Sequence, residues 1–451
     1  MQKIHSSIRL FWLFLTVVAL FAGTACQKIK TDEKETKNPL ITELAARKSI
    51  AGNEQEWAKM QALFKKLSEA INKNSEDNTS KIKLTELYLT EVRITGNSLY
   101  YGAALKVIDN ITKDLKATQE QIFLAKSYKA SILLSLHRFA EAKAIAEEAK
   151  AVNDFDSGIY GALVDANVEL GNYDEAVKAC DKMLAIHPDL RSYSRSSYIR
   201  QIYGDNPGAV AAIKLAIQAG PAGSESTEWA RVILGDLYLS MGKTDTAKML
   251  YETSLQYRPN YASAEMGLAK VGRAERKYDD AITHCKNAIR SLTESSFVAF
   301  LADLYELKGE KDKAKEVRAD VLRLLVESEN ENAKETYAKH NGSREIASAL
   351  MAAGKWDEAL KNARIDLNFR PENIDANELV AWIYYLKGDY ANAKGYADKM
   401  MRMNTQNANL IYKAGMIYEA SGDTEKGKSL KAQAQKINKN IDPLILAAQK
   451  A

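Results

Sequence analysis

The stretch LGDLYLSMGKTDTA, residues 234–247, decides the fold. It holds Gly235, a tyrosine three residues later, Gly242 four residues after that tyrosine, and Ala247 after five more. Pro259 follows Ala247 by twelve residues. A glycine can end a helix with a turn of positive φ, and an alanine where two helices cross lets them approach closely. The stretch therefore predicts two antiparallel helices joined by a tight turn.

The same arrangement recurs along most of the chain. The small residue that follows each turn stands at positions 104, 142, 176, 209, 247, 281, 314, 359, 393 and 427, the last being a glycine. Successive positions in this series differ by 38, 34, 33, 38, 34, 33, 45, 34 and 34. This pattern resembles the tetratricopeptide repeat, a helix–turn–helix unit of about 34 residues.

The resemblance implies an all-α, right-handed superhelical solenoid of about nine or ten repeats, because one unit cannot bury its own apolar face. We predict the solenoid at 119–440, more degenerate helical repeats at 53–118 and a C-terminal tail at 441–451. The longest interval in the series contains the polar segment SENENAKETYAKHNGS. There, at 329–342, we expect a lengthened helix and a loop, either a hinge or a tolerated insertion.

Residues 1–25 have the pattern of a signal peptide. Residues 1–9 are basic, and residues 10–22 form a continuous apolar run. In a helix this run would span about 20 Å, short of the ~30 Å of a membrane core. A cleaved signal peptide is therefore favoured over an uncleaved membrane anchor.

The sequence Gly23-Thr24-Ala25-Cys26 resembles the lipobox of bacterial lipoproteins, although Gly23 stands where leucine is usual. The resemblance implies lipidation of Cys26, a flexible polar tether over 26–52 and, because Gln27 is not an aspartate, delivery to the outer membrane of the bacterial cell envelope. Exposure to the periplasm or to the outside stays open. An ordinary secretory cleavage site is the alternative.

The repeat register predicts which residues face the concave groove. In this family these are the second, fifth, ninth and twelfth positions of each first helix. They form two clusters rich in residue types that are enriched in interface hot spots. The candidate residues are Arg191, Tyr198, Gln201, Trp229, Asp236, Lys270 and Arg273 in the first cluster, Trp382, Tyr385, Tyr412 and Met416 in the second, and Arg200, which replaces a usual tyrosine.

Each candidate also has a simpler interpretation. Any one of these side chains could pack against the adjacent repeat, and Arg200 could pair with a neighbouring acid. Arg200 could instead contact a bound acidic or carboxyl-terminal peptide, and as a set the candidates are the best guess for a binding site. The second cluster, which is aromatic, would suit an amphipathic helix or an extended peptide.

Charge and motifs narrow the function classes. Formal net charge is +4, and without residues 1–25, which hold Lys3 and Arg9, 61 bases face 59 acids. Such a balance lacks the field on which nucleic-acid binding depends. The five histidines are isolated in the sequence, and no metal-ligand or nucleophile motif is present. Cys180 and Cys285 share a core position of the repeat. We therefore expect no enzyme activity, no metal and no small-molecule cofactor.

These observations predict a lipid-tethered, non-enzymatic scaffold that binds a protein or peptide in its groove. The alternative is a glycan-binding lipoprotein resembling the SusD group, which works beside an outer-membrane transporter. In that group the sugar sites lie largely in segments inserted between a few repeats, whereas here repeats fill nearly the whole chain. An enzyme built on the same scaffold is a third hypothesis.

Overall fold

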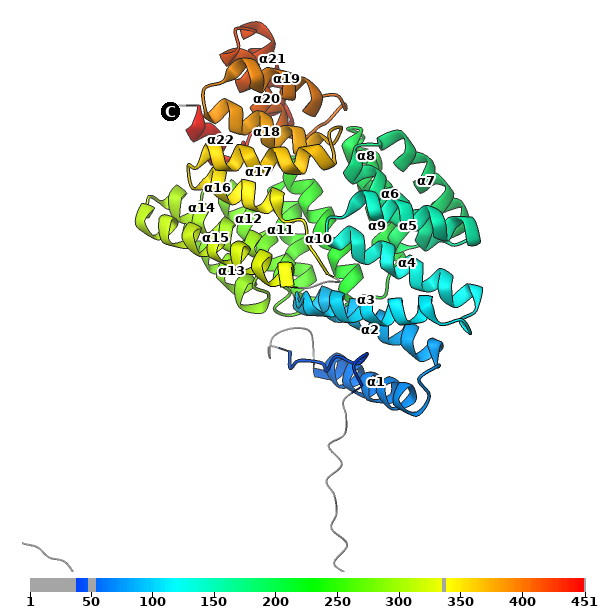
Figure 1. Ribbon diagram of the computed structural model, residues 1–451. Helices are drawn as coiled ribbons and strands as arrows, with labels where there is room; N and C mark the ends of the chain where they lie inside the picture. Colours follow the sequence, from blue (N-terminus) through cyan, green and yellow to red (C-terminus); the bar gives the residue numbers. More distant parts are fainter. Residues whose placement is uncertain (1–37, 48–53, 335–337, 450–451) are drawn as a thin grey trace, which may run out of the picture. The chain divides into compact units, whose positions relative to one another are not determined.

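The computed structural model describes residues 38–47, 54–334 and 338–449. The chain divides into two units, residues 1–38 and 39–451, and the description below concerns the second. All regular structure in the described residues is helical, in twenty-two helices (Figure 1). The expectation of an all-α solenoid is confirmed.

Helices α2 to α21 form ten consecutive antiparallel hairpins, preceded by α1 (Glu54–Lys73) and followed by α22 (Pro443–Ala448). The hairpins are α2 (Asn78–Thr95) with α3 (Leu99–Lys113), α4 (Gln119–Ser135) with α5 (Phe139–Val152), α6 (Ser157–Leu170) with α7 (Tyr173–Ile186), α8 (Leu190–Ile202) with α9 (Asn206–Ala219), α10 (Glu225–Ser240) with α11 (Thr244–Tyr257), α12 (Ala262–Ala274) with α13 (Tyr278–Ser291), α14 (Ser295–Lys308) with α15 (Lys311–Lys334), α16 (Ser343–Ala352) with α17 (Trp356–Phe369), α18 (Ile374–Leu386) with α19 (Tyr390–Met400), and α20 (Ala408–Ala420) with α21 (Thr424–Ile437).

The recurring alanines lie where the sequence predicts them. All nine, from Ala104 to Ala393, are fully buried. The tenth position is Gly427, where even an added Cβ would lie 2.7 Å from the Gly415 carbonyl oxygen. Small residues at the helix crossings therefore set the close approach within each hairpin.

The turn between the two helices of a hairpin needs a left-handed residue. Gly242, in the stretch that predicts the fold, has φ of 73°. Two hairpins use other residues at the equivalent position, His137 with φ of 56° and Arg276 with φ of 62°. The register of the turn is therefore kept even where its glycine is absent.

The inserted segment lengthens α15, as expected. This helix has 24 residues, whereas the equivalent α13 and α17 have 14 each. Residues 335–337 lie outside the described residues, and α16 begins at Ser343.

Residues 39–47 contact the first three helices. The backbone N–H and carbonyl of Thr42 both bond to the Tyr88 hydroxyl at 2.8 Å, and the N–H of Ala45 donates to the Tyr100 hydroxyl at 2.8 Å. Arg47 pairs with Glu91 and with Glu56. Residues 39–47, which lie within the segment predicted as a tether, are thus held against α1, α2 and α3. Two buried tyrosines supply partners for their backbone.

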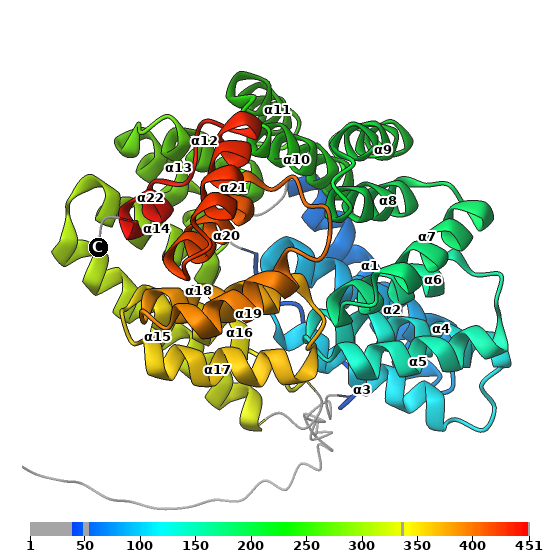
Figure 2. The same ribbon diagram turned by 90° about the horizontal axis from the view of Figure 1, so that it is seen from above.

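The hairpins curve around a common axis (Figure 2). Hydrogen bonds join hairpins that are six apart along the chain. The turn of α6/α7 meets the segment before α18: the side-chain amide of Asn373 donates to the carbonyl of Val168 at 3.3 Å and to that of Glu169 at 3.0 Å. Arg402 donates to the Gly171 carbonyl at 2.6 Å. Successive superhelical turns thus touch directly.

The same contact repeats at neighbouring hairpins. The N–H of Asn341 donates to the Leu136 carbonyl at 3.1 Å, and the side-chain amide of Asn438 donates to the carbonyls of Leu239 and Ser240 at 3.1 and 3.2 Å. At Gly204 an added Cβ would lie only 1.9 Å from the Asn404 carbonyl oxygen. The ends of four consecutive first helices, α4, α6, α8 and α10, are therefore covered by the next superhelical turn.

Candidate functional site

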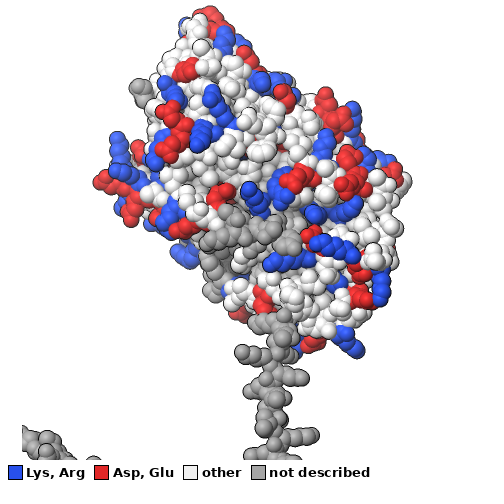
Figure 3. All heavy atoms as spheres, in the orientation of Figure 1, with Lys and Arg blue, Asp and Glu red and all other residues white. Residues whose placement is uncertain are grey.

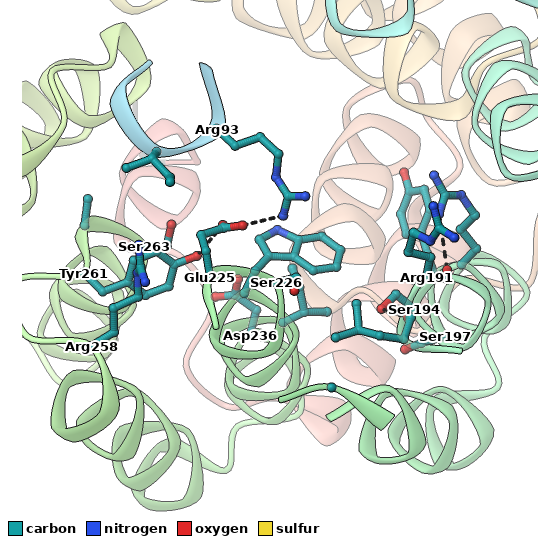
Figure 4. Close-up of a pocket in the computed structure, with 18 of the residues that line it drawn as sticks. Arg93, Arg191, Ser194, Ser197, Glu225, Ser226, Asp236, Arg258, Tyr261 and Ser263 are labelled. Carbon is teal, nitrogen blue, oxygen red and sulfur yellow. Dashed lines mark hydrogen bonds and ion pairs between the residues drawn. The ribbon is translucent and has the colours of Figure 1, made fainter. Parts of the chain in front are cut away.

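The first helices of consecutive hairpins enclose a cavity of about 1260 Å³, which we call the inner cavity. Its wall comes chiefly from α8 and α10, with the ends of α2, α4 and α6 and the segments that lead into α12 and α14. Figure 4 shows side chains from several of these elements converging on the same space. The volume exceeds the ~300–1,000 Å³ usual for small-molecule sites, so the cavity has room for a short polypeptide segment.

Five residues of the predicted groove line the inner cavity: Arg191, Tyr198, Gln201, Trp229 and Asp236. They recur at helical spacing along one face of α8 and one face of α10, which the repeat register turns toward the axis. The side chain of Asp189 begins α8 by accepting the N–H of Ser192 at 2.9 Å. Ser224 begins α10 in the same way.

Two aromatic side chains are exposed in the wall. Tyr198 retains 43% of its accessible surface and Trp229 retains 39%. Although part of the Tyr198 ring is accessible, the surrounding protein removes much of the water around its hydroxyl. This desolvation, with the carboxylates of Asp375 and Glu169 as further causes, raises the pKa of its phenol above the usual range. Large aromatic rings exposed in a concave wall can bury their apolar surface against a ligand.

The charged groups around these rings are largely paired. Arg93 pairs with Glu225, which also accepts the Tyr261 hydroxyl at 3.1 Å (Figure 4). Arg195 forms two bonds to Asp165, at 2.9 and 2.5 Å. The inner cavity therefore offers polar groups of both signs with apolar rings between them, and a strongly basic lining is absent from its described residues.

The surface of the unit agrees with this balance. On the face drawn in Figure 3, Lys and Arg side chains are interspersed with Asp and Glu side chains. Mixed charge of this kind gives little long-range attraction for a polyanion.

Besides Arg191, which pairs with Asp189, three predicted groove residues form ion pairs with acids. Arg200 pairs with Asp205 at 2.6 Å, which is the simpler of its two interpretations. Arg273 is buried and pairs with Asp442 at 2.6 Å and Asp303 at 3.5 Å. Lys270 pairs with Asp236 at 3.0 Å.

The second predicted cluster is covered by the chain itself. Trp382, Tyr412 and Met416 are buried in one apolar cluster with Ile441 and Ile445. Tyr385 is partly buried against the same cluster and stacks on Trp382 with ring centroids 4.9 Å apart. The Tyr412 hydroxyl donates to the Gln449 side chain at 2.9 Å. The predicted tail thus places α22, a short helix, on this surface.

Sequence reasoning missed Arg93 and Arg195 in the cavity wall. Arg93 lies at the end of α2, in the degenerate region where the repeat register could not be read. Arg195 lies one helical turn from Arg191 and Tyr198, and this spacing could have indicated it. Glu225 could not be paired with Arg93 from the sequence, because 132 residues separate them.

The two cysteines in the described residues are buried and reduced. Burial raises the pKa of the Cys180 thiol to about 11 and that of Cys285 to about 12. Both stay protonated at neutral pH, so neither is an activated nucleophile.

Comparison with protein families gives the repeats their name. The model of the tetratricopeptide repeat family matches residues 129–190 and 234–296. These two segments match tetratricopeptide repeats. The other hairpins continue the same architecture at the same spacing, so the chain has the fold of a tetratricopeptide-repeat solenoid from α2 to α21.

Several solved structures resemble parts of the chain. A type IV pilus biogenesis factor, PilW, is 16% identical over 45% of this chain and 92% of its own, with a TM-score of 0.38. PilF of Pseudomonas aeruginosa is 17% identical over 47% and 91%, with a TM-score of 0.28. A tetratricopeptide repeat protein from Parabacteroides merdae is 18% identical over 58% and 99%, with a TM-score of 0.33. These scores support no conclusion about a partner.

No curated protein matches the chain. In the described residues no helix has both the length and the apolar character needed to cross a membrane. The predicted signal peptide and Cys26 lie outside the described residues.

Proposed function

We propose that this chain is a non-enzymatic scaffold whose inner cavity binds a segment of a protein partner. The observation that carries the proposal is the exposure of Tyr198 and Trp229 on adjacent repeats of a large concave wall. Tyrosine and tryptophan are the residue types that most often dominate binding energy when a partner covers them.

The lining indicates the kind of segment. Aromatic rings would hold one or two apolar side chains, and the paired ions around them would accept a segment with charges of both signs. The exposed Arg191 guanidinium, held by Asp189 at 3.2 Å, is available to a carboxylate of the partner. Tetratricopeptide-repeat proteins bind partners in general through such faces, and an extended or short helical peptide fits the volume.

The proposal includes a membrane tether. Lipid on Cys26 would hold the scaffold at the bacterial outer membrane. Acylation by more than one chain is what stable anchoring requires. Replacing Cys26 by serine should abolish incorporation of labelled palmitate and should release the protein from the membrane fraction. Retention of both in the variant would contradict the lipid anchor.

The binding site is tested by photo-crosslinking in cells. A photoreactive amino acid at position 229 or 198 should capture a specific protein partner. The same amino acid at Met249, an exposed apolar position on the second helix α11, serves as the control. Capture of the same proteins from all three positions would refute the cavity as the binding site.

Binding to the captured partner then measures the contribution of the two rings. Trp229→Ala and Tyr198→Ala should each raise the dissociation constant at least tenfold, and Met249→Ala should leave it unchanged.

The glycan hypothesis is tested in parallel. Binding on a glycan array that Trp229→Ala abolishes, without any protein captured in cells, would favour a sugar ligand.

A further inference from the structure

Two histidines and a glutamate meet where one superhelical turn touches the next. His137 is the turn residue between α4 and α5, whereas His340 and Glu345 flank the start of α16. The imidazole rings of His137 and His340 lie 4.6 Å apart between centroids. The Nδ1 atom of His137 lies 3.6 Å from a Glu345 carboxylate oxygen. The sequence interpretation of isolated histidines is therefore wrong for this pair, because the fold joins positions that are far apart in the chain.

The three side chains have the arrangement of a ligand set. One ligand atom from each lies within 4.8 Å of the others. Tetrahedral ligands at ~2.1 Å from a metal ion are about 3.4 Å apart, so small side-chain rotations would close the set. Two imidazoles and one carboxylate are donors that divalent transition ions such as Zn²⁺ accept, with water in a fourth position.

A second observation points to a missing partner at this place. The other carboxylate oxygen of Glu345, Oε2, is buried and has no hydrogen-bond partner. A buried carboxylate oxygen without a partner is costly, and a bound cation would satisfy it.

The surroundings of His340 fit the same role. Its Nδ1 atom lies 4.0 Å from a Glu329 carboxylate oxygen, and that oxygen also accepts the N–H of Gly342 at 3.2 Å. With Nδ1 turned toward a carboxylate, Nε2 is left to bind a metal. Metal-binding histidines are usually oriented in this way.

The local backbone holds His137 in place. Its φ of 56° is a left-handed conformation, which most other hairpins of the solenoid give to glycine at this position. The next turn fixes the loop from both sides, because the N–H of Asn341 donates to the Leu136 carbonyl and the Asn341 carbonyl lies 3.3 Å from His137 Nδ1.

We propose that His137, His340 and Glu345 form a binding site for a divalent transition-metal ion, with Zn²⁺ as the probe. The ion would link the first superhelical turn to the second at the point where the inserted segment enters α16. This site is separate from the inner cavity, whose lining contains none of the three residues.

The test is a calorimetric titration of the untagged full chain with Zn²⁺, since a polyhistidine tag would itself bind zinc. One ion should bind per chain. His137→Gly is the central variant, because glycine accepts the left-handed turn and the protein should fold normally without the imidazole. His137→Gly, His340→Ala and Glu345→Gln should each weaken zinc affinity at least tenfold.

Each control variant also removes one histidine, but from outside the proposed site. His187→Ala removes an exposed histidine near Asp189, and His284→Ala removes one that contacts Glu265 at 2.6 Å. Both should bind zinc as the unaltered protein does. Co²⁺ should give visible absorption bands of a four-coordinate site that are lost in His137→Gly.

Two outcomes would overturn the proposal. The first is the absence of zinc binding by the unaltered chain, which would mean that His137, His340 and Glu345 make only polar contacts with one another. The second is zinc binding that His137→Gly and His340→Ala leave unchanged, which would place the ion elsewhere.

Discussion

Single residues in the hairpin turns show how firmly the repeat fixes its backbone. Arg276 takes φ of 62° although it is neither glycine nor asparagine, and its side chain is exposed. An L-residue in this conformation costs about 1–2 kcal/mol, while glycine loses more chain entropy on folding. The turn is thus imposed on Arg276 by the packing of the two helices.

Arg276→Gly should therefore stabilise the protein by about 0.5–1 kcal/mol, measured by urea denaturation. Glu275→Gly is the matched control, because Glu275 has φ of −82° and gains nothing from glycine. The control should be destabilised. Equal effects of the two changes would show that the left-handed turn carries no strain.

Ala247 is the residue that the fold-deciding stretch places at a helix crossing, and it is fully buried. Ala247→Leu should destabilise the protein by about 1–3 kcal/mol, because the added atoms would force α10 and α11 apart. Met249→Leu, at an exposed position two residues away, should change the unfolding free energy by less than about 0.5 kcal/mol. An unfolding midpoint unchanged by Ala247→Leu would argue against close packing at this site.

At the scale of elements, α22 is the part of the fold whose packing could least be anticipated. Its six residues are too few for a periodic pattern to identify a helix. The helix covers the aromatic surface of α18 and α20, where the sequence placed a peptide-binding cluster. The type of surface was therefore predictable from the residues, but its occupant was not.

Undocking α22 is expected from a single substitution. Ile445 is buried against the Trp382 cluster, whereas Ala447 on the same helix is exposed. Ile445→Asp should release the helix because it would bury an unpaired charge, and Ala447→Asp should not. The expected signal is a red shift of tryptophan fluorescence with the rest of the unfolding transition retained. No shift with Ile445→Asp would mean that other contacts hold α22.

The same physical reason decides, for each element, which features could be predicted from the sequence. Helix boundaries, turn residues and crossing alanines depend on neighbours within one repeat, so their spacing could be read directly. Arg191, Tyr198 and Trp229 follow from the same local register. The engagement of Arg273 by Asp442, or of Arg93 by Glu225, depends on how small rotations add up over many hairpins, which no local pattern contains.

For the whole molecule, the distinctive feature is the direct contact between successive superhelical turns. Two turn glycines allow the energy of this contact to be distinguished from the energy of the turn conformation, because only one of them touches the next superhelical turn. Gly171 has φ of 81° and lies against Glu372, whose backbone would be 2.3 Å from an added Cβ. Gly309 has φ of 87° and open space around it.

Gly309→Ala should cost about 1–2 kcal/mol from the left-handed conformation alone. Gly171→Ala should cost this amount and about 1–3 kcal/mol more, because the next turn must move away. Hydrogen exchange should show the extra loss at residues 370–376 only in Gly171→Ala. Equal losses in both variants would show that the turns gain no stability from touching.

A partly buried ion pair makes a second contact between distant parts of the solenoid and gives it a pH dependence. Glu56 of α1 bonds to Arg258 at 3.0 Å and to Arg47 at 2.8 Å. Burial alone would raise the pKa of Glu56, but its bonds to Arg258 and Arg47 are stronger in sum and lower the pKa below its usual value of 4.5. The pair therefore stabilises the fold above about pH 4.5, and this contribution is lost as the pH falls through the lowered pKa.

Glu56→Gln should lower the unfolding free energy by about 1 kcal/mol at pH 7, and the difference from the unaltered protein should shrink at pH 3.5. Urea titrations at the two pH values measure this. Glu54→Gln, an exposed neighbour in the same helical turn, should show no such change. A difference that stays constant between the two pH values would exclude the ion pair as its source.

The six-hairpin interval between touching turns also limits how this chain can vary in length. In an open array, a duplication or loss of one repeat moves the flanking repeats apart or together and leaves each interface intact. Here it would shift Asn373, Asn404 and Asn438 by a whole hairpin relative to their seats on Val168, Gly204 and Leu239. Length changes of a single repeat between these partners should therefore be rejected, while extensions beyond α22 should be tolerated.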